Sequence, residues 1–446
     1  MPADLRLIFK AYDVRGVYPD EFDEEAAFRI GRAFAAWTES DRILLGRDCR
    51  TSSPALSSAF ADGVTASGVG VVDMGLATTD LLYFAAGRMS LPGAMFTASH
   101  NPPQYNGLKL CLSGAAPVGE DSGLQDVRRL AEEDTGAPSV SKGRRDDVDL
   151  LDDYLEHVLS FADVAALSPL VVAADAANGM AGLVLPPLFE RLPFKFVPLY
   201  MELDGSFPNH PADPIVPENQ EDVKRAVVEN GADLGLAFDG DADRVFFVDE
   251  NAQGISGSLI TALVAIGMLE RYPGATILHN LICSRVVPEV IREHGGEPVR
   301  TRVGHSFVKK VMADTGAVFG GEHSGHYYFR DHYRADSGIV AAVVVLAQMS
   351  KAGKPLSELL EPLRRYRDSG EINSKVADPP GTIEKIAAAY PHERQDRMDG
   401  LTVESDDWWF NVRPSNTEPL LRLNVEAKAD ELLRQKVDEV LSLIRA

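Results

Sequence analysis

The sequence is poor in cysteine and in positive charge, and it has no long hydrophobic run. Its 446 residues include three cysteines, Cys49, Cys111 and Cys283, with no CxxC pair. This excludes a disulfide framework and a thiolate zinc site. Lys and Arg number 44 against 67 Asp and Glu, which gives a formal net charge of -23. Such a charge disfavours nucleic acid and anionic membranes as partners.

No segment predicts insertion into a membrane or transport across one. The most apolar stretch, 338–349, is too short to span a bilayer, and the opening MPADLRLIFK lacks the apolar core of a signal peptide. Hydrophobic residues at 45% and charged residues at 25% are typical of a globular protein. We therefore expect a cytoplasmic protein with no membrane and no nucleic-acid partner. At about 150 residues per domain, the length predicts roughly three domains.

Short β-branched runs alternate with amphipathic stretches from the N-terminus to about residue 367. The runs at 43–45, 94–96 and 234–236 are typical of strands, and 27–37 is typical of a helix. This alternation predicts α/β domains whose mixed sheets are mostly parallel, with helices on both faces.

Changes in composition divide the chain into four parts. A polar segment at 139–149 and breaks near residues 251 and 369 separate them. Beyond the last break, two strands and a closing helix, expected at 408–412, 420–425 and 430–444, indicate a small α+β domain with an antiparallel sheet. The predicted domains are three α/β units and a C-terminal α+β unit, at residues 1–148, 149–250, 251–368 and 369–446.

The loop 97–103, TASHNPP, directly follows the apolar run 94–96. Loops at the carboxyl ends of parallel strands hold ligands in α/β proteins, so this loop would present the hydroxyl of Ser99. A serine in this setting is a nucleophile or a phosphoryl carrier, and a purely structural turn is the alternative. His100 is a poor partner for a serine-hydrolase pair, because consecutive side chains on extended backbone point in opposite directions.

Three aspartates alternate with small residues in the segment 239–244, DGDADR. Carboxylates at this spacing can converge on one hard cation, and without a cation they would repel one another. An EF-hand loop is excluded because Arg244 stands at the sixth position, where that loop needs Gly. We expect Mg²⁺ at Asp239, Asp241 and Asp243, with an acidic turn as the alternative.

Two further polar loops carry groups that suit a sugar phosphate. The segment 320–326, GGEHSGH, offers a carboxylate, two imidazoles and a hydroxyl, which read sugar hydroxyls or move protons. Zinc is an alternative there, although the helical HExxH spacing is absent. The segment 411–419, NVRPSNTEP, sets Arg413 among hydroxyl and amide groups that suit a phosphate. No Walker A sequence is present, which disfavours a P-loop nucleotide site.

With FKAYDVRG at 9–16, these motifs stand in the order found in the α-D-phosphohexomutase family, which the chain resembles over nearly its whole length. The motifs are FKAYDVRG, TASHNPPQYNGLKL, DGDADR, GEHSGH and RPSNTEP. They are most similar to those of the bacterial phosphomannomutases, some of which also accept glucose phosphates. The resemblance implies three similar α/β domains and a smaller C-terminal domain around a central cleft.

The resemblance also implies roles for single residues. Ser99 would be the phosphoserine that gives and receives the phosphoryl group, and it would ligate Mg²⁺ together with Asp239, Asp241 and Asp243. The residues around the transferring group would be Arg15, Lys109, Arg244 and His326, with Lys109 and His326 as candidates for general acid and base. The sugar would be contacted by Glu322, His323, Ser324 and His305. The phosphate that is not reacting would be held by Arg413, Ser415, Asn416 and Thr417.

The implied reaction interconverts mannose 6-phosphate and mannose 1-phosphate, and also glucose phosphates, through a hexose 1,6-bisphosphate that serves as activator. His323 and Asn416 favour mannose and glucose over glucosamine within the family. A phosphoglucosamine mutase and a strict phosphoglucomutase are the alternatives. A sugar-phosphate-binding protein without activity is disfavoured, because Ser99, the aspartates and Lys109 are all present. The sequence leaves open the preference between mannose and glucose, and whether the protein is a monomer or a homodimer.

Overall fold

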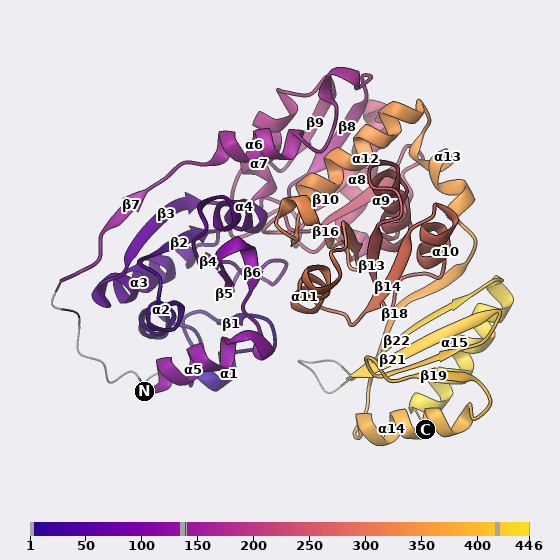
Figure 1. The fold of residues 1–446 in the computed structure, drawn as a ribbon. Helices are drawn as coiled ribbons and strands as arrows, with labels where there is room; N and C mark the ends of the chain where they lie inside the picture. The colour runs from indigo at the N-terminus through magenta and orange to yellow at the C-terminus, as the bar shows by residue number, and fades with distance from the viewer. Residues whose placement is uncertain (1–3, 134–138, 140, 415–419, 446) are drawn as a thin grey trace.

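The computed structural model describes residues 4–133, 139, 141–414 and 420–445, and it contains four sheets in chain order (Figure 1). The first sheet has the strand order β1-β5-β4-β2-β3-β7, with β6 paired to β5. Its strands are β1 (Val14–Val17), β2 (Arg42–Arg47), β3 (Gly70–Leu76), β4 (Gly93–Phe96), β5 (Tyr105–Leu112), β6 (Ala116–Pro117) and β7 (Arg145–Asp147). The helices of this part are α1 (Leu5–Ile8), α2 (Glu24–Thr38), α3 (Ser53–Ala66), α4 (Thr79–Met89) and α5 (Leu124–Glu133).

The second sheet has the order β12-β11-β10-β8-β9, and the third has the order β14-β13-β15-β16-β17. The elements of the second part are α6 (Leu151–Leu159), β8 (Val171–Asp175), α7 (Ala181–Phe189), β9 (Lys195–Leu199), α8 (Glu221–Asn230), β10 (Leu234–Phe238), β11 (Val245–Asp249) and β12 (Gly254–Ile255). Those of the third are α9 (Gly257–Arg271), β13 (Thr276–Asn280), α10 (Val286–Glu293), β14 (Glu297–Thr301), α11 (His305–Thr315), β15 (Phe319–Gly321), β16 (Tyr327–Phe329), β17 (Ala335–Asp336), α12 (Gly338–Ala352) and α13 (Leu356–Leu360). Because β12 pairs with β11, the second sheet extends past residue 250, where the sequence placed a boundary.

The fourth sheet is antiparallel throughout, as the sequence predicted, in the order β18-β22-β21-β20-β19. Its elements are β18 (Arg367–Lys375), α14 (Pro379–Ala389), β19 (Arg394–Asp396), β20 (Leu401–Glu404), β21 (Trp408–Pro414), β22 (Leu420–Ala427) and α15 (Asp430–Arg445). Strand β19, with the sequence RQD, has no apolar alternation that would have revealed it. The expected linker at 139–149 contains β7, which adds a parallel edge strand to the first sheet.

Parallel pairs do not predominate in the first three sheets, and this corrects the sequence prediction of mostly parallel sheets. In the second sheet β8 runs parallel to β9 and β10, whereas β11 runs antiparallel to β10 and β12. The cause is the length of the connections, because a short loop joins neighbouring strands only if they are antiparallel. Three of these short loops, β4–β5, β10–β11 and β15–β16, are the polar motifs identified in the sequence.

A single hydrophobic cluster runs through the first three parts of the chain. It includes Leu82 of α4, Tyr154 of α6, Phe247 of β11 and Val343 of α12, all buried. The fourth sheet has its own cluster, built around Phe410 and packed against α14 and α15. The first three parts therefore share a core, and the fourth meets the third through smaller contacts such as the cluster of Leu281, Ile282 and Trp409.

Helix α12, although apolar, lies largely in this shared core. Among the described residues, no single helix is long and apolar enough to cross a membrane. The helical segments 338–352 and 356–363 pass that test only as a pair, with a bend of 94° between them.

Asp80, at the start of α4, joins the first three parts of the chain. Its fully buried carboxylate accepts hydrogen bonds from Thr78, from Tyr154 of α6 at 2.6 Å, and from Ser337 at the start of α12. Burial raises the pKa of Asp80 to about 6, although these hydrogen bonds oppose the rise.

The Asp80→Asn substitution tests this junction. Because the pKa of Asp80 is higher in the folded protein than in the unfolded chain, its contribution to stability is present at low pH and is lost as pH rises towards 6. The stability of the native protein relative to Asp80→Asn should therefore fall between pH 4 and pH 7, by on the order of 3 kcal/mol. Thermal unfolding of both proteins across this range measures the difference. A difference that stays constant with pH would contradict the assignment.

Candidate active site

The loop after β4 brings the hydroxyl of Ser99 against the acidic loop after β10. Ser99 is 6% exposed, and its Oγ donates a hydrogen bond of 2.7 Å to Asp239 Oδ2. Its φ of 49° is left-handed, which is uncommon for a residue other than glycine. Gly240 allows this contact, because a Cβ there would lie 2.4 Å from the carbonyl oxygen of Ser99. The first two sequence motifs therefore form one site.

His100 lies closer to Ser99 than the sequence indicated. The Oγ of Ser99 is 3.2 Å from Nδ1 of His100, because the left-handed backbone at Ser99 is not extended and does not send the two side chains apart. Burial, followed by the charges of Arg244 and Arg15, holds the pKa of His100 well below its ordinary value. His100 is therefore a neutral neighbour of the hydroxyl.

A buried arginine that the sequence analysis did not identify holds the Ser99 loop in place. The guanidinium of Arg50, which is 1% exposed, donates to the carbonyl oxygens of Ser99 at 2.8 Å and Asn101 at 2.6 Å. It also donates to those of Pro102 at 2.8 Å and Tyr105 at 3.1 Å. Arg50 pairs with Asp48 at 3.2 Å. Three carbonyls of this loop and that of Tyr105, the first residue of β5, thus converge on one planar group. The segment 46–50, GRDCR, has no local sequence pattern that would predict that Arg50 binds the Ser99 loop.

The three aspartates of the β10–β11 loop converge as predicted. Each of Asp239, Asp241 and Asp243 is at most 1% exposed, and one oxygen from each lies within 4.8 Å of the others. Oδ1 of Asp241 and Oδ1 of Asp243 are buried without a hydrogen-bond partner in the described part of the chain. Unsatisfied buried carboxylate oxygens are the ligands that a hard cation takes, so these residues fit a divalent metal ion.

Two cations from different parts of the chain compensate these carboxylates. Lys109 of β5 donates from Nζ to Asp241 at 2.8 Å and to Asp243 at 2.5 Å. Burial alone would lower the pKa of Lys109, but the two carboxylates outweigh it and raise that pKa well above its ordinary value. Arg244 donates from Nε to Asp239 at 3.0 Å, and its Nη2 lies 3.5 Å from Ser99 Oγ. Both side chains are therefore charged beside the hydroxyl and the acidic loop.

The third part of the chain supplies a chain of charged contacts from His326 through Asp336 to Lys309. His326 Nδ1 lies 2.9 Å from Asp336 and 3.8 Å from Asp243, and Asp336 pairs with the buried Lys309 at 2.8 Å. Burial lowers the pKa of His326, but the carboxylates of Asp243 and Asp336 reverse this and raise it. His305 lies near the same group, and burial, with the charge of Lys309, keeps its pKa well below the ordinary value.

The side chains of the β15–β16 loop lie in two different surroundings: Glu322 among buried protein donors, and His323 at a cavity. Glu322 is 1% exposed, and its carboxylate accepts from Asn280 at 3.0 Å, from the backbone N–H of Gly304 at 3.2 Å and from the hydroxyl of Tyr328. Three protein donors therefore hold its carboxylate, which has about four acceptor positions, so one position remains for a sugar hydroxyl. Ser324 is half-buried on the same loop.

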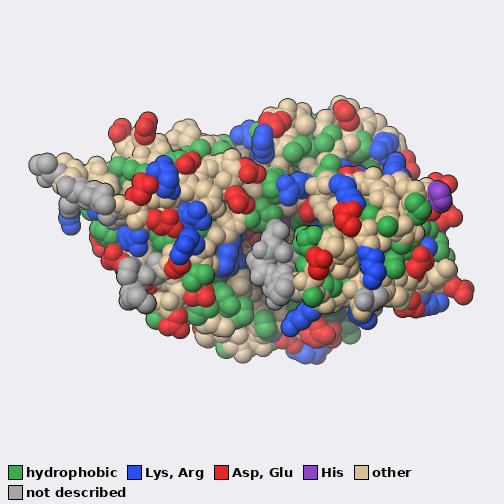
Figure 2. All heavy atoms as spheres, turned by 90° about the horizontal axis from the view of Figure 1, so that it is seen from below, with side chains coloured by type: hydrophobic (Ala, Val, Ile, Leu, Met, Phe, Trp, Pro, Cys, Tyr) green, Lys and Arg blue, Asp and Glu red, His purple; other side chains and the backbone are tan. Residues whose placement is uncertain are grey.

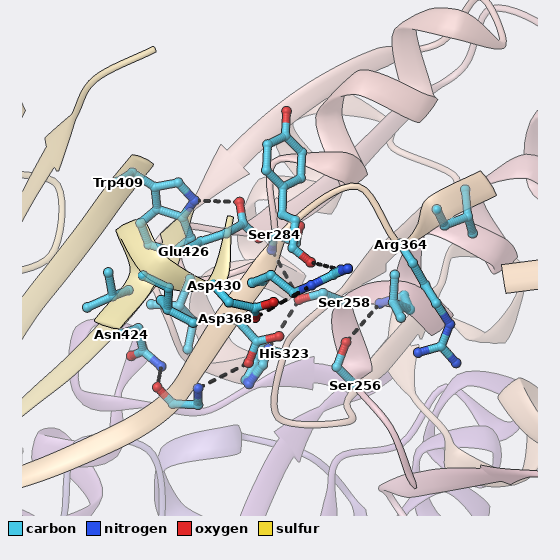
Figure 3. Close-up of a pocket in the computed structure, with 18 of the residues that line it drawn as sticks. Ser256, Ser258, Ser284, His323, Arg364, Asp368, Trp409, Asn424, Glu426 and Asp430 are labelled. Atoms are coloured by element: carbon cyan, nitrogen blue, oxygen red, sulfur yellow. Dashed lines mark hydrogen bonds and ion pairs between the residues drawn. The ribbon is translucent and has the colours of Figure 1, made fainter. Parts of the chain in front are cut away.

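His323 lines a different cavity, of about 290 Å³, between the third and fourth parts of the chain (Figure 3). Its Nδ1 lies 3.1 Å from Ser258 Oγ, and Asp368, Asn424 and Glu426 line the same cavity. Neither Ser99 nor the three aspartates line it. The side chains of His323 and Glu322, although adjacent in sequence, thus lie in different surroundings, which the sequence did not indicate.

Two of the arginines predicted to bind phosphate, Arg15 and Arg413, lie in different parts of the chain. Arg15 of β1 donates from Nη1 to the side chain of Asn101 at 2.5 Å and to the carbonyl of Ala98 at 3.3 Å, so it flanks the Ser99 loop. Arg413 of β21 donates to Glu371 at 2.6 Å. The remaining predicted phosphate ligands, Ser415, Asn416 and Thr417, lie outside the described residues.

The Asp241→Asn substitution tests the metal site without reference to activity. Removing one carboxylate should weaken Mg²⁺ binding by about tenfold or more, because an oxygen ligand and a negative charge leave together. Calorimetric titration of the metal-free protein with MgCl₂ measures the affinity, and Mg²⁺ should also raise the melting temperature of the native protein. Asp213→Asn is the control, since Asp213 lies 4.0 Å from Arg244 but outside the triad. Equal Mg²⁺ affinities in the native protein and Asp241→Asn would contradict the site.

Four protein-family models match the chain, each describing one domain of phosphoglucomutase/phosphomannomutase. The α/β/α domains I, II and III match residues 6–136, 152–254 and 256–366, and the C-terminal domain matches residues 371–443. The matches follow the four sheets in order.

Known proteins resemble the chain over almost its full length. A phosphomannomutase of Salmonella montevideo is 41% identical, with 98% of this chain and 99% of that protein covered. A protein of Xanthomonas campestris pv. campestris named as phosphohexose mutases is also 41% identical, over 98% of this chain and 99% of its own. The crystal structure of a phosphoglucomutase/phosphomannomutase family protein from Burkholderia thailandensis is 34% identical, with a TM-score of 0.90 over 98% of this chain and 97% of that one. The chain belongs to the phosphoglucomutase/phosphomannomutase family, the α-D-phosphohexomutases.

Proposed function

We propose that this protein is a phosphomannomutase that interconverts mannose 6-phosphate and mannose 1-phosphate through a phosphoserine at Ser99, and that it also accepts glucose phosphates. The observation that carries the proposal is the contact of Ser99 Oγ with Asp239 at 2.7 Å, inside a buried cluster of three carboxylates, Lys109 and Arg244. The names of the relatives support mannose phosphate as the substrate.

Phosphoryl transfer needs an acceptor held in line and compensation of spread negative charge. In the first half-reaction the P–O bond to Ser99 breaks and a P–O bond to a sugar hydroxyl forms, while the hydroxyl proton passes to a base and the Ser99 oxygen takes up a proton. The product is a hexose 1,6-bisphosphate. In the second half-reaction the Ser99 hydroxyl loses its proton and takes the other phosphoryl group, while the P–O bond to the sugar breaks and the sugar oxygen regains a proton.

The residues around Ser99 suit these steps. Asp239, Asp241 and Asp243, with the seryl phosphate, would hold Mg²⁺, which when bound neutralises charge on the phosphoryl oxygens. Arg15 and Arg244 flank the hydroxyl and would bind the same oxygens. Lys109 and His326 are the proposed proton donor and acceptor. Both contact Asp243, so a proton lost or gained by either alters the charge beside the same carboxylate.

The proposal also covers the activator, the substrate contacts, the location in the cell and the oligomeric state. We propose hexose 1,6-bisphosphate as activator, sugar contacts from Glu322, Ser324 and His305, and phosphate contacts from Arg413, Ser415, Asn416 and Thr417. We also propose a cytoplasmic protein that acts as a monomer or homodimer without a nucleic-acid partner. On the face drawn in Figure 2, described Lys and Arg side chains are interspersed with Asp and Glu, and they form no continuous basic patch there.

The Ser99→Ala variant tests the phosphoserine. In a coupled assay with Mg²⁺ and catalytic hexose 1,6-bisphosphate, kcat should fall by at least about a thousandfold, because the group that carries the phosphoryl is gone. Ser206→Ala, an exposed serine, is the matched control and should keep full activity. Near-normal turnover by Ser99→Ala would contradict the mechanism.

The substrate is tested in the same assay on the native protein, which should use mannose 1-phosphate and glucose 1-phosphate and leave glucosamine 1-phosphate nearly untouched. Dominant glucosamine turnover would keep the chemistry but reject the substrate.

The Arg50→Lys variant tests the positioning of the Ser99 loop. One ammonium cannot reach four carbonyls in the geometry of a guanidinium, so Ser99 should shift and kcat should fall by about tenfold to a hundredfold, with a smaller change in KM. Arg29→Lys is the control, because Arg29 also donates to main-chain carbonyls in the same domain, at Ala131 and Glu132, but not on this loop. An equal loss of kcat in both variants, in step with their melting temperatures, would reduce Arg50 to a structural role.

A further inference from the structure

Two arginines face each other across strands β21 and β22. Arg413 and Arg422 are direct partners in the antiparallel register. Like charges in opposite positions of a sheet repel, so the pair needs an anion between or beside it. Glu371 of β18 supplies one: its Oε2 accepts from Arg413 at 2.6 Å, and its Oε1 accepts from Arg422 at 3.1 Å. A single carboxylate thus spans two guanidinium groups.

An irregularity in β18 places Glu371 there. Asp368 pairs with Glu426, but the next register pair is Glu371 with Asn424, so the residues between them form a bulge. Gly370 in the bulge has a φ of 63°, a conformation that suits glycine. Bulges turn a strand and redirect side chains, and they are frequent beside active sites.

Asn424 connects the bulge to the arginine pair. Its Nδ2 lies 3.4 Å from the carbonyl oxygen of Gly370, and its Oδ1 accepts from Arg413 at 3.3 Å. Asn424 therefore orients the guanidinium of Arg413 from one side while Glu371 holds it from the other.

The ion-paired group is exposed mainly through Glu371 and Arg422. Their side chains are 25% and 33% exposed, whereas the side chain of Arg413 is 8% exposed. An anion from solution can therefore reach Arg422 and the carboxylate that joins it to Arg413. A phosphate monoester offers the same oxygen acceptors as a carboxylate, with more charge, and arginine pairs bind it strongly.

We propose that Glu371 occupies the place where the non-reacting phosphate of the substrate binds, and that this phosphate displaces the Glu371 carboxylate from Arg413 and Arg422. This inference rests on the proposed function and deepens it. It makes Arg422 a second arginine of the phosphate site and makes Glu371 an internal competitor. The competitor limits affinity, so that a bisphosphate can leave the arginines, turn round and bind again by its other phosphate.

The Glu371→Gln variant tests the competition, with inorganic phosphate and mannose 1-phosphate as probes. Without the competing charge, phosphate should bind at least about threefold more tightly by calorimetry, and it should raise the melting temperature more than in the native protein. In the mutase assay kcat should fall, because the bisphosphate leaves the arginines more slowly. Glu371→Asp, whose shorter side chain cannot span both arginines, should show intermediate phosphate affinity and provides a second, conservative variant.

Three controls make the outcome decisive. Glu384→Gln removes a carboxylate of the same domain that pairs with Arg397 away from this site, and it should leave phosphate binding unchanged. Arg413→Gln and Arg422→Gln should each weaken phosphate binding. Unchanged or weaker phosphate binding in Glu371→Gln overturns the competition, and full phosphate affinity in Arg422→Gln overturns its place in the site. Phosphate binding needs no turnover, so a protein without mutase activity that still shows tighter binding in Glu371→Gln would reject the proposed function alone.

Discussion

The compensation of three buried carboxylates is the constraint on which this structure depends. Asp239, Asp241 and Asp243 lie almost without solvent on one short loop, and buried charges of one sign are costly unless cations or a metal meet them. Burial, reinforced by the neighbouring aspartates and opposed by Arg244, raises the pKa of Asp239 to about 7. A seryl phosphate placed at Ser99 adds to that charge. The residues of this cluster therefore fit a cation.

The compensating groups come from three different parts of the chain, so the electrostatics of the site also organise the fold. Lys109 belongs to the first sheet, the aspartates and Arg244 to the second, and His326 to the third. The same three parts share one hydrophobic cluster and meet again at Asp80. The fourth sheet has a separate core, and it carries the arginine pair that would hold the far phosphate. The proposed reaction centre and the proposed phosphate site therefore belong to parts of the chain with separate hydrophobic cores.

The sequence singled out the polar side chains of the candidate site better than it predicted how they are arranged. Local motifs predicted Ser99 and the aspartates, because a hydroxyl after a strand and carboxylates at alternate positions are visible without a structure. Arg50, Asp336 and Glu371 were not predicted, because each acts through partners that are far away in sequence. The prediction that the sheets are mostly parallel was wrong, because the short loops that carry the motifs join neighbouring strands in antiparallel pairs. The contact between Ser99 and His100 was missed because a left-handed φ at a serine has no sequence signature.

The most direct test of the account is the mass of the protein after incubation with hexose 1,6-bisphosphate and Mg²⁺, followed by peptide mapping of the loop 97–103. The protein should gain one phosphoryl group, on Ser99, which is stable to acid as a phosphate ester of serine is, and which mannose 1-phosphate removes again. A protein that gains no phosphoryl group, or that carries it on another residue such as His100, would contradict the central claim.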